Sequence, residues 1–355
     1  MSASRRRSRP RKRIDLALQG GGAHGAFTWG VLDRLLEDER LEVSAISGTS
    51  AGAMNAVVLA SGLMAGGRSA AREALRGFWT DVGAGVRLNP LFGGGLFAGT
   101  LGGALSTWSP LGPYLDMASR VFSPYQLNPL NVNPLRRVLE KAVDFDAVRR
   151  CDKVRLFVGA THVRSGRLKV FRNESLSLEA VLASACLPML FQAVEIDGEA
   201  YWDGGYMGNP SLFPLVADSG AHDLLLVQLN PLEHDDVPTQ APDILERIDE
   251  ITFNGSVLKE LRLIAMLKEM LHREGRPLRE YHEPLIRHLG ALHVHRLDGA
   301  SALADLGSTN RLQADTATLT RLHRAGHAAA DEWLGSNFAH LGRRSTVDLA
   351  REFGH

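Results

Sequence analysis

Two consecutive units of strand, glycine turn and helix occupy the first 60 residues and constrain the fold more than any other feature. The apolar run 14–18 predicts a buried strand that ends at a glycine-rich turn, and residues 26–37 then carry apolar side chains at helical spacing. A second strand, 43–47, leads through another glycine turn into a further apolar helix. This alternation predicts a parallel sheet with crossover helices.

The remaining periodicity predicts one large α/β unit followed by a mostly helical region. A hairpin is expected around Asp197-Gly198, a two-residue turn signal between two apolar arms. Further strands are expected at 154–160, 168–171 and 224–229, and helices at 177–185, from 242 onward and at 319–334. We therefore expect a three-layer α/β/α core over residues 14–235, with a mostly parallel central sheet, and a mostly helical C-terminal extension over 236–355.

The charge and the cysteine content limit which cellular compartment and which binding partners are expected. Forty basic and forty acidic side chains cancel, so no net charge favours nucleic acid as a partner. The basic run 5–13 predicts a disordered tail over residues 1–13, with weak attraction to anionic lipid headgroups as the alternative. No signal-peptide segment follows the tail, and the only cysteines are Cys151 and Cys186. We expect a cytoplasmic protein, with peripheral contact at the inner membrane face as an option.

Residues 88–115 form an insert without any charged side chain. The insert is long enough to span a bilayer, but it contains seven glycines and three prolines. A spanning helix must satisfy its own backbone hydrogen bonds, and this density of helix breakers opposes it. We expect an apolar cap over an acyl-binding site, or else a loop folded onto the core.

The second glycine turn reads Gly-Thr-Ser-Ala-Gly and places a serine between a buried strand and an apolar helix. A nucleophilic serine needs such an exposed, strained turn, and the flanking glycines remove side chains that would collide there. The following helix directs its N-terminal N–H groups to where negative charge develops in acyl transfer. We predict Ser50 as the nucleophile, on a turn formed by Gly48, Thr49, Ala51 and Gly52. A serine that only caps the helix is the alternative.

The first glycine turn fits the pattern G-x-G-x-x-G of a dinucleotide-binding loop. That interpretation also needs an acidic residue at the end of the second strand, where this chain has Ser47-Gly48 instead. Successive backbone N–H groups in such a loop also suit an oxyanion. We therefore expect an oxyanion hole formed by Gly20, Gly21, Gly22, Ala23, His24 and Gly25.

Asp203-Gly204-Gly205 ends the predicted hairpin, and in isolation it is a common turn. The loop G-G-G-x-x-G, the turn G-T-S-A-G and the motif D-G-G, in this order, resemble those of the patatin-like phospholipases over about residues 14–235. The small-residue segment 183–188 resembles the family as well. The resemblance implies a patatin-like sandwich, a dyad of Ser50 and Asp203, an oxyanion hole at the glycine loop, and lipid substrates. His24 replaces the Arg or Lys often found in that loop, which is expected to weaken anion stabilisation or make it pH-dependent.

Several alternatives stay open at this point. A Ser-Asp-His triad is available in chain order, because eleven histidines follow Asp203; His293 and His295, on one face of a predicted strand, are expected to be solvated. The dyad would also serve another ester, such as a storage polyester or a neutral glyceride. A catalytically idle lipid-binding scaffold is the remaining alternative. No H-E-x-x-H and no C-x-x-C occurs, so neither metal nor cofactor is expected, and no oligomeric state is predicted.

Overall fold

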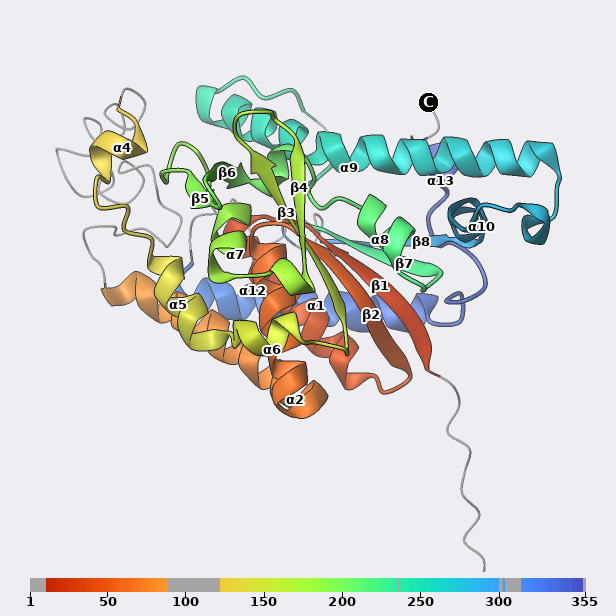
Figure 1. Ribbon diagram of the computed structural model, residues 1–355, viewed down its shortest axis with the longest axis horizontal. Helices are drawn as coiled ribbons and strands as arrows, with labels where there is room; N and C mark the ends of the chain where they lie inside the picture. The colour runs from red at the N-terminus through yellow and green to blue at the C-terminus, as the bar shows by residue number, and fades with distance from the viewer. Residues whose placement is uncertain (1–10, 89–121, 235, 300–302, 304–313, 354–355) are drawn as a thin grey trace, which may run out of the picture.

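The centre of the protein is an eight-stranded sheet with the order β5-β6-β3-β2-β1-β7-β8, and β4 pairs with β3 (Figure 1). The computed structural model describes residues 11–88, 122–234, 236–299, 303 and 314–353. The strands are β1 (Lys12–Leu18), β2 (Leu41–Gly48), β3 (Arg155–His162), β4 (Leu168–Arg172), β5 (Val194–Ile196), β6 (Glu199–Asp203), β7 (Asp223–Gln228) and β8 (His293–Asp298). Strands β3, β2, β1, β7 and β8 run parallel, whereas β4, β5 and β6 pair antiparallel. The predicted mostly parallel sheet is confirmed.

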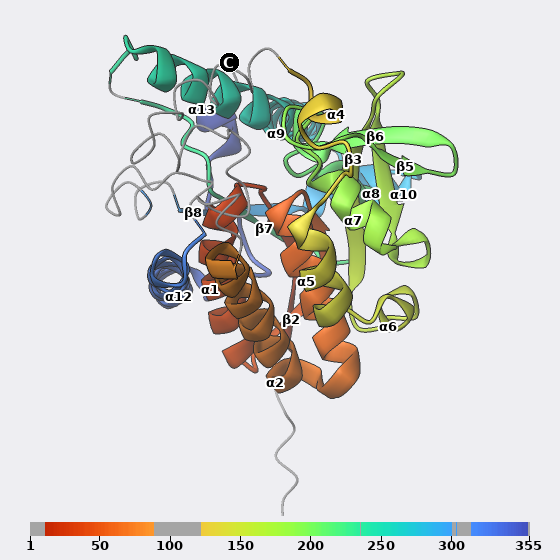
Figure 2. The same cartoon turned by 90° about the vertical axis from the view of Figure 1, so that its left-hand side faces the viewer.

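Helices cover both faces of the sheet and bury two apolar cores. Successive strand residues point to opposite faces, so Leu16 and Ile46 belong to one core and Ala17 and Ala45 to the other. The first core is closed by α1 (Gly25–Glu37), α2 (Ala51–Leu88), α5 (Pro134–Ala142), α6 (Phe145–Arg149), α7 (Leu178–Ser184) and α12 (Thr316–Asn337). The second is closed by α8 (Phe213–Asp218), α9 (Ala241–Glu274), α10 (Pro284–Ala291) and α13 (Leu349–Phe353). Figure 2 shows α9 and the α1–α2–α12 group on different sides of the strands.

Five short elements complete the described structure. They are η1 (Gly22–His24), α4 (Pro124–Leu127), η3 (Asn173–Ser175), η4 (Gly204–Tyr206) and η5 (Leu278–Glu280). The hairpin between β5 and β6 turns at Asp197 and Gly198, which both have positive φ, +52° and +78°. Two residues of positive φ match the right-handed twist of the flanking strands, as the sequence predicted.

The first strand begins earlier than expected. Lys12 and Arg13, predicted to end the basic tail, are paired with β2, and Lys12 Nζ donates to the carbonyl oxygens of Phe338 and Leu341. The prediction of a tail over 1–13 is therefore wrong at its end, because backbone pairing and these two carbonyls hold Lys12 in the sheet. Residues 1–10, the rest of that tail, lie outside the described residues.

Helix α2 is longer than the sequence suggested. It bends at Gly66 and Gly67, where Gly67 has φ of +75°, and continues to Leu88. Leu88 is also the first residue of the predicted apolar insert, whose remaining residues, 89–115, lie outside the described part of the chain. Across the described ranges, no helix combines the length and the apolar character that crossing a bilayer requires.

The C-terminal region contributes a strand to the sheet as well as helices. Strand β8 pairs in parallel with β7 and extends the sheet. Helix α12 packs tightly on α1, because glycines stand at the contact: a Cβ on Gly30 would lie 2.0 Å from the carbonyl oxygen of His323, and one on Gly326 would lie 2.0 Å from that of Phe27. The region predicted as a mostly helical extension is thus built into both the sheet and the first core.

Candidate active site

Ser50 lies on a sharp turn between β2 and α2, with a backbone φ of +54°. A non-glycine residue in this left-handed region is strained, and such strain is typical of a nucleophile between strand and helix. The backbone packs too closely around the two flanking glycines for any side chain to fit. A Cβ on Gly48 would lie 2.7 Å from the Gly52 carbonyl, and one on Gly52 would lie 2.3 Å from the Leu18 carbonyl oxygen. The Ser50 N–H donates to Ser184 Oγ at 3.0 Å.

The glycine loop lies directly beside this turn. A Cβ on Gly20 would approach the Cβ of Ser50 to 2.8 Å, so only glycine allows the two backbones to lie so close. Gly22 has φ of +59°, and the loop tightens through η1 into α1. The parallel pairing of β1 with β2 explains the proximity, because both strands end at the same edge of the sheet.

Some N–H groups of the loop already have partners within the protein. The Gly20 N–H donates to Asn209 Oδ1 at 2.6 Å, and the His24 N–H donates to the Gly21 carbonyl at 3.1 Å. The Gly25 N–H also bonds within the turn. Gly22 and Ala23 form the first turn of η1, where backbone N–H groups have no acceptor within the helix.

Asp203 is the last residue of β6 and is 1% exposed. Its Oδ1 accepts a hydrogen bond from the Gly205 N–H at 2.7 Å, and the Ser50 side chain lies near enough to interact with the carboxylate. Burial raises the pKa of Asp203 to about 7, although the Gly205 N–H and the Ser50 side chain act in the opposite direction. A carboxylate with this pKa is a much stronger proton acceptor than an exposed aspartate, whose pKa is about 3.9.

The two glycines after Asp203 allow close packing on both sides. A Cβ on Gly204 would lie 2.2 Å from the Gly159 carbonyl oxygen of β3, and one on Gly205 would lie 2.1 Å from the ring of Phe253 in α9. Phe253 also packs against Tyr206, with ring centroids 5.2 Å apart. Helix α9 therefore forms one wall beside the aspartate.

Four polar residues that position this site through hydrogen bonds were not predicted from the sequence. Ser184 and Asn209 bond the backbones of Ser50 and Gly20, as described above. Gln19 is fully buried: its side-chain oxygen accepts from the N–H groups of Leu229 and Asn230, and its Nε2 donates to Asn254 of α9 at 3.1 Å. Glutamine at the end of a strand and asparagine six residues after the aspartate carry no local signal of these roles, because every partner is distant in sequence.

Several of the described histidines that follow Asp203 pair with carboxylates other than Asp203. His234 pairs with Glu250, and His295 Nε2 lies 3.0 Å from Asp223 Oδ1. The expectation that His295 is solvated is wrong: it is fully buried, since β8 lies inside the sheet and Thr346 contacts the other ring nitrogen at 3.1 Å. The His295–Asp223 pair lies near the starts of β7 and β8, at the edge of the sheet opposite to Ser50.

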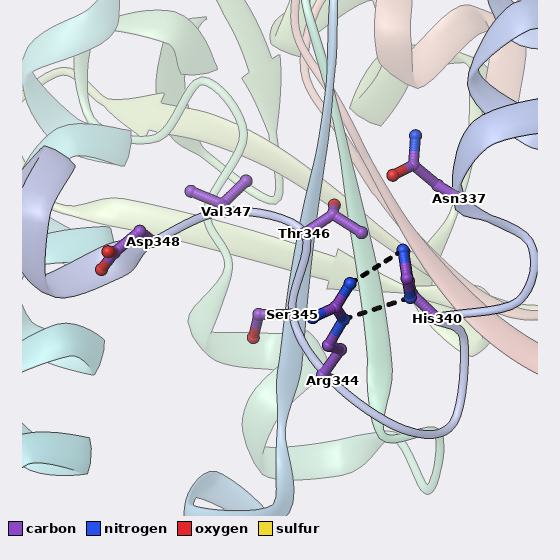
Figure 3. Close-up of a pocket in the computed structure, with 7 residues that line it drawn as sticks. All are labelled: Asn337, His340, Arg344, Ser345, Thr346, Val347 and Asp348. Atoms are coloured by element: carbon purple, nitrogen blue, oxygen red, sulfur yellow. Dashed lines mark hydrogen bonds between the residues drawn. The ribbon is translucent and has the colours of Figure 1, made fainter.

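Two pockets lie away from Ser50 and Asp203. The first, about 340 Å³, is bounded by the segment after α12, where Arg344 bonds the ring of His340 (Figure 3). The second, about 370 Å³, is lined by the starts of β1, β7 and β8, including Lys12 and His293. Thr346 bonds Val294 near the start of β8, so the first pocket also lies toward the amino ends of the strands. Neither pocket includes the predicted site residues.

Sequence comparison agrees with this geometry. The family described as patatin-like phospholipase matches residues 16–216, more than half of the chain and the whole segment from β1 through Ser50 and Asp203 to α8. The chain belongs to this family. Patatin-like phospholipases are hydrolases of lipid esters, so this protein is a patatin-like hydrolase of carboxylic esters. Comparison with curated proteins gives no match.

Two solved structures resemble this patatin-like protein at low identity. VipD from Legionella pneumophila is 13% identical with a TM-score of 0.42, over 98% of this chain and 73% of that one. ExoU in its complex with SpcU, from the type III secretion system of Pseudomonas aeruginosa, is 18% identical with a TM-score of 0.32, over 97% of this chain and 74% of that one. The family assignment rests on the sequence match over 16–216.

Proposed function

We propose that this patatin-like protein is a serine lipid acyl hydrolase in which Ser50 is the nucleophile and Asp203 is the only catalytic base. The observation that carries the proposal is the position of the Ser50 side chain beside a buried carboxylate whose pKa is raised to about 7 by that burial. Such a base needs no histidine between it and the serine.

In the proposed reaction, Ser50 Oγ attacks the ester carbonyl carbon while its proton moves to Asp203. The carbonyl oxygen becomes an oxyanion, which we assign to the N–H groups of Gly21, Gly22 and Ala23, since those of Gly20, His24 and Gly25 are engaged. The C–O bond to the leaving group then breaks, and protonated Asp203 gives its proton to the leaving alcohol. Water attacks the acyl-Ser50 ester by the same route and releases the fatty acid.

A lipid substrate is supported by the apolar surface beside Asp203. Tyr206 and Met207 follow the two glycines and are 37% and 40% exposed. On α9, which reaches the site through Phe253, four aliphatic side chains are exposed by 40% to 56%: Ile244, Leu245, Ile248 and Ile251. We call these four the α9 aliphatic stripe. Exposed apolar side chains next to a hydrolase site favour contact with a lipid surface over a water-soluble ester.

The decisive experiment measures fatty-acid release from mixed phospholipid vesicles without added metal. We expect release by wild type and by Ser69→Ala, a matched control at an exposed serine of α2, and none by Ser50→Ala or Asp203→Asn. A fluorophosphonate should label wild type and Ser69→Ala, but not Ser50→Ala. Activity of Asp203→Asn close to wild type would refute the dyad and favour a histidine triad.

The same experiment separates the alternative substrates. Labelling at Ser50 without phospholipid hydrolysis would indicate that the substrate is another ester. A neutral glyceride and a storage polyester would then be assayed directly. Neither labelling nor turnover would instead leave a lipid-binding scaffold. Release by wild type and Ser69→Ala, but not by Ser50→Ala, would establish phospholipid as a substrate, and the next question would be the headgroup and the acyl position.

A further inference from the structure

Helices α1 and α12 bring four metal-ligating side chains together outside the proposed catalytic machinery. Asp33 and Glu37 are four residues apart on α1, and His323 and His327 are four residues apart on α12, so each pair lies on one helical face. The two faces meet because Gly30 and Gly326, described above, let the helix backbones approach closely.

The side chains pair across the helix contact. His323 Nε2 lies 3.2 Å from Asp33 Oδ2, and His327 Nε2 lies 3.2 Å from Glu37 Oε2. Asp33, Glu37 and His327 each offer one ligand atom, and these three atoms lie within 4.8 Å of one another. Among the residues that the structure describes, this is the one group of three such side chains with that geometry.

The spacing between His327 and Glu37 suits a tetrahedral transition-metal ion. With bonds of about 2.0–2.2 Å, the ligand atoms of a tetrahedral Zn²⁺ site lie about 3.4 Å apart, close to the 3.2 Å between His327 and Glu37. A mixed set of imidazole nitrogen and carboxylate oxygen suits Zn²⁺, whereas Mg²⁺ and Ca²⁺ prefer oxygen alone. The side chains of His327 and Glu37 are each 34% exposed, so an ion can reach them from solvent.

The surrounding groups hold the two carboxylates in place. Arg72 of α2 donates from Nε to Asp33 Oδ1 at 2.5 Å and from its terminal nitrogen to Glu37 Oε1 at 2.7 Å. Partners of this kind orient carboxylate ligands in many metal sites, although the charge of Arg72 also opposes a cation.

We propose that Asp33, Glu37 and His327 bind one Zn²⁺ ion per chain, at a site independent of ester hydrolysis. The ion joins α12, from the C-terminal region, to α1, which begins immediately after the glycine loop. Zinc would therefore stabilise the packing of α12 on α1. Because only the folded protein brings the three ligands together, zinc should raise the thermal midpoint of unfolding.

The test is titration of the metal-free full-length protein with Zn²⁺ by calorimetry, with Mg²⁺ and Ca²⁺ as comparison ions. We expect one Zn²⁺ per chain and no saturable binding of the other two. His327→Ala and Glu37→Gln should each weaken zinc binding by at least about 10-fold, whereas His272→Ala, at an exposed histidine of α9, should bind like wild type. Circular dichroism and the thermal midpoint in chelator should match wild type in all variants.

A second readout uses Trp29, whose ring centroid lies 3.9 Å from that of His323. Titration with Cu²⁺, a quencher of indole fluorescence, should reduce emission in wild type, and Zn²⁺ should prevent this change; Trp29→Phe should lose the response. Absence of saturable zinc binding to wild type would overturn the proposal. Equal affinity in His327→Ala, Glu37→Gln and wild type would also overturn it, because the ion would then occupy another place.

Discussion

Asn209 accepts a 2.6 Å hydrogen bond from the backbone N–H of Gly20 and so joins the aspartate segment to the start of the glycine loop. The two residues are 189 positions apart in sequence, and Asn209 is 1% exposed. Gly20 in turn lies against Ser50. One buried amide therefore sets the position of the loop proposed to stabilise the oxyanion relative to both proposed catalytic residues.

Asn209→Ala should lower kcat by roughly 10- to 100-fold, because the N–H groups proposed to face the oxyanion would shift relative to Ser50. The buried Gly20 N–H would lose its acceptor, which costs about 1–3 kcal/mol of folding free energy. Asn209→Asp keeps the acceptor and should recover most of the stability, but its negative charge beside the oxyanion should keep kcat low. Measurements are kcat on a soluble ester and urea unfolding; wild-type kcat in Asn209→Ala would refute this role.

The activity of wild type should depend on pH through Asp203. Below a pH of about 7 the carboxyl is protonated and cannot accept the Ser50 proton, so kcat/KM should rise with pH and level off above that value. The profile is measured with a soluble ester, so that vesicle properties do not change with pH. A rate that is constant from about pH 5 to pH 9 would contradict Asp203 as the base.

Asp203→Asn should abolish activity and yet stabilise the fold at neutral pH. The pKa of Asp203 in the folded state, about 7, exceeds that of an exposed aspartate, about 3.9, so the folded state binds more protons between these values. Wild-type stability therefore falls as pH rises through this window. The variant should gain on the order of 2 kcal/mol at about pH 8, and almost nothing at about pH 4, in urea unfolding.

Asp15→Asn is the matched control for this effect. Burial also raises the pKa of Asp15 to about 7, and the nearby Ser219 side chain acts against it. Asp15 lies in β1 with its pairing partner Leu224 near the start of β7, away from Ser50. The stability of Asp15→Asn relative to wild type should increase as pH rises, and its kcat should equal that of wild type. Loss of activity in both variants would show that the assay reports on folding.

Gly205→Ala and Gly255→Ala should change stability in opposite directions. A Cβ at 205 would lie 2.1 Å from the ring of Phe253, so this variant should lose about 1–3 kcal/mol and, through the displaced N–H to Asp203, also activity. Gly255, inside α9, has no atom within 4 Å of an added Cβ, and alanine there should add about 0.5–1 kcal/mol. Urea unfolding and kcat measure both; a neutral Gly205→Ala would contradict the packing argument.

The α9 aliphatic stripe should matter for lipid surfaces alone. The double variant Ile248→Asp and Ile251→Asp should lower hydrolysis of phospholipid vesicles by roughly 10-fold or more, because each side chain would lose its transfer from water to lipid. Hydrolysis of a soluble short-chain ester should not change. Met270→Asp, at a side chain 58% exposed near the other end of α9, is the control and should hydrolyse vesicles normally. Equal losses on both substrates would point to a folding defect.

The sequence by itself determined the order of strands and turns and the residues proposed for the chemistry. Local rules were sufficient for this: glycines on both sides of Ser50, a two-residue turn at Asp197-Gly198, and apolar spacing that separates helices from strands. The three motifs are short and contiguous, so their residues can be recognised without knowledge of their neighbours. The family match over residues 16–216 confirms the family that these motifs indicate.

Only the tertiary structure decided which groups support those residues, because the supporting contacts join segments far apart in the chain. The side chain of Asn209 accepts a hydrogen bond from the Gly20 N–H, and that of Ser184 accepts one from the Ser50 N–H. Burial by β3 and α9 raises the pKa of Asp203. The predicted solvent exposure of His295 was wrong for the same reason. Strand periodicity places a side chain on a face of the sheet, but only the packing of β8 against its neighbours decides whether that face meets water.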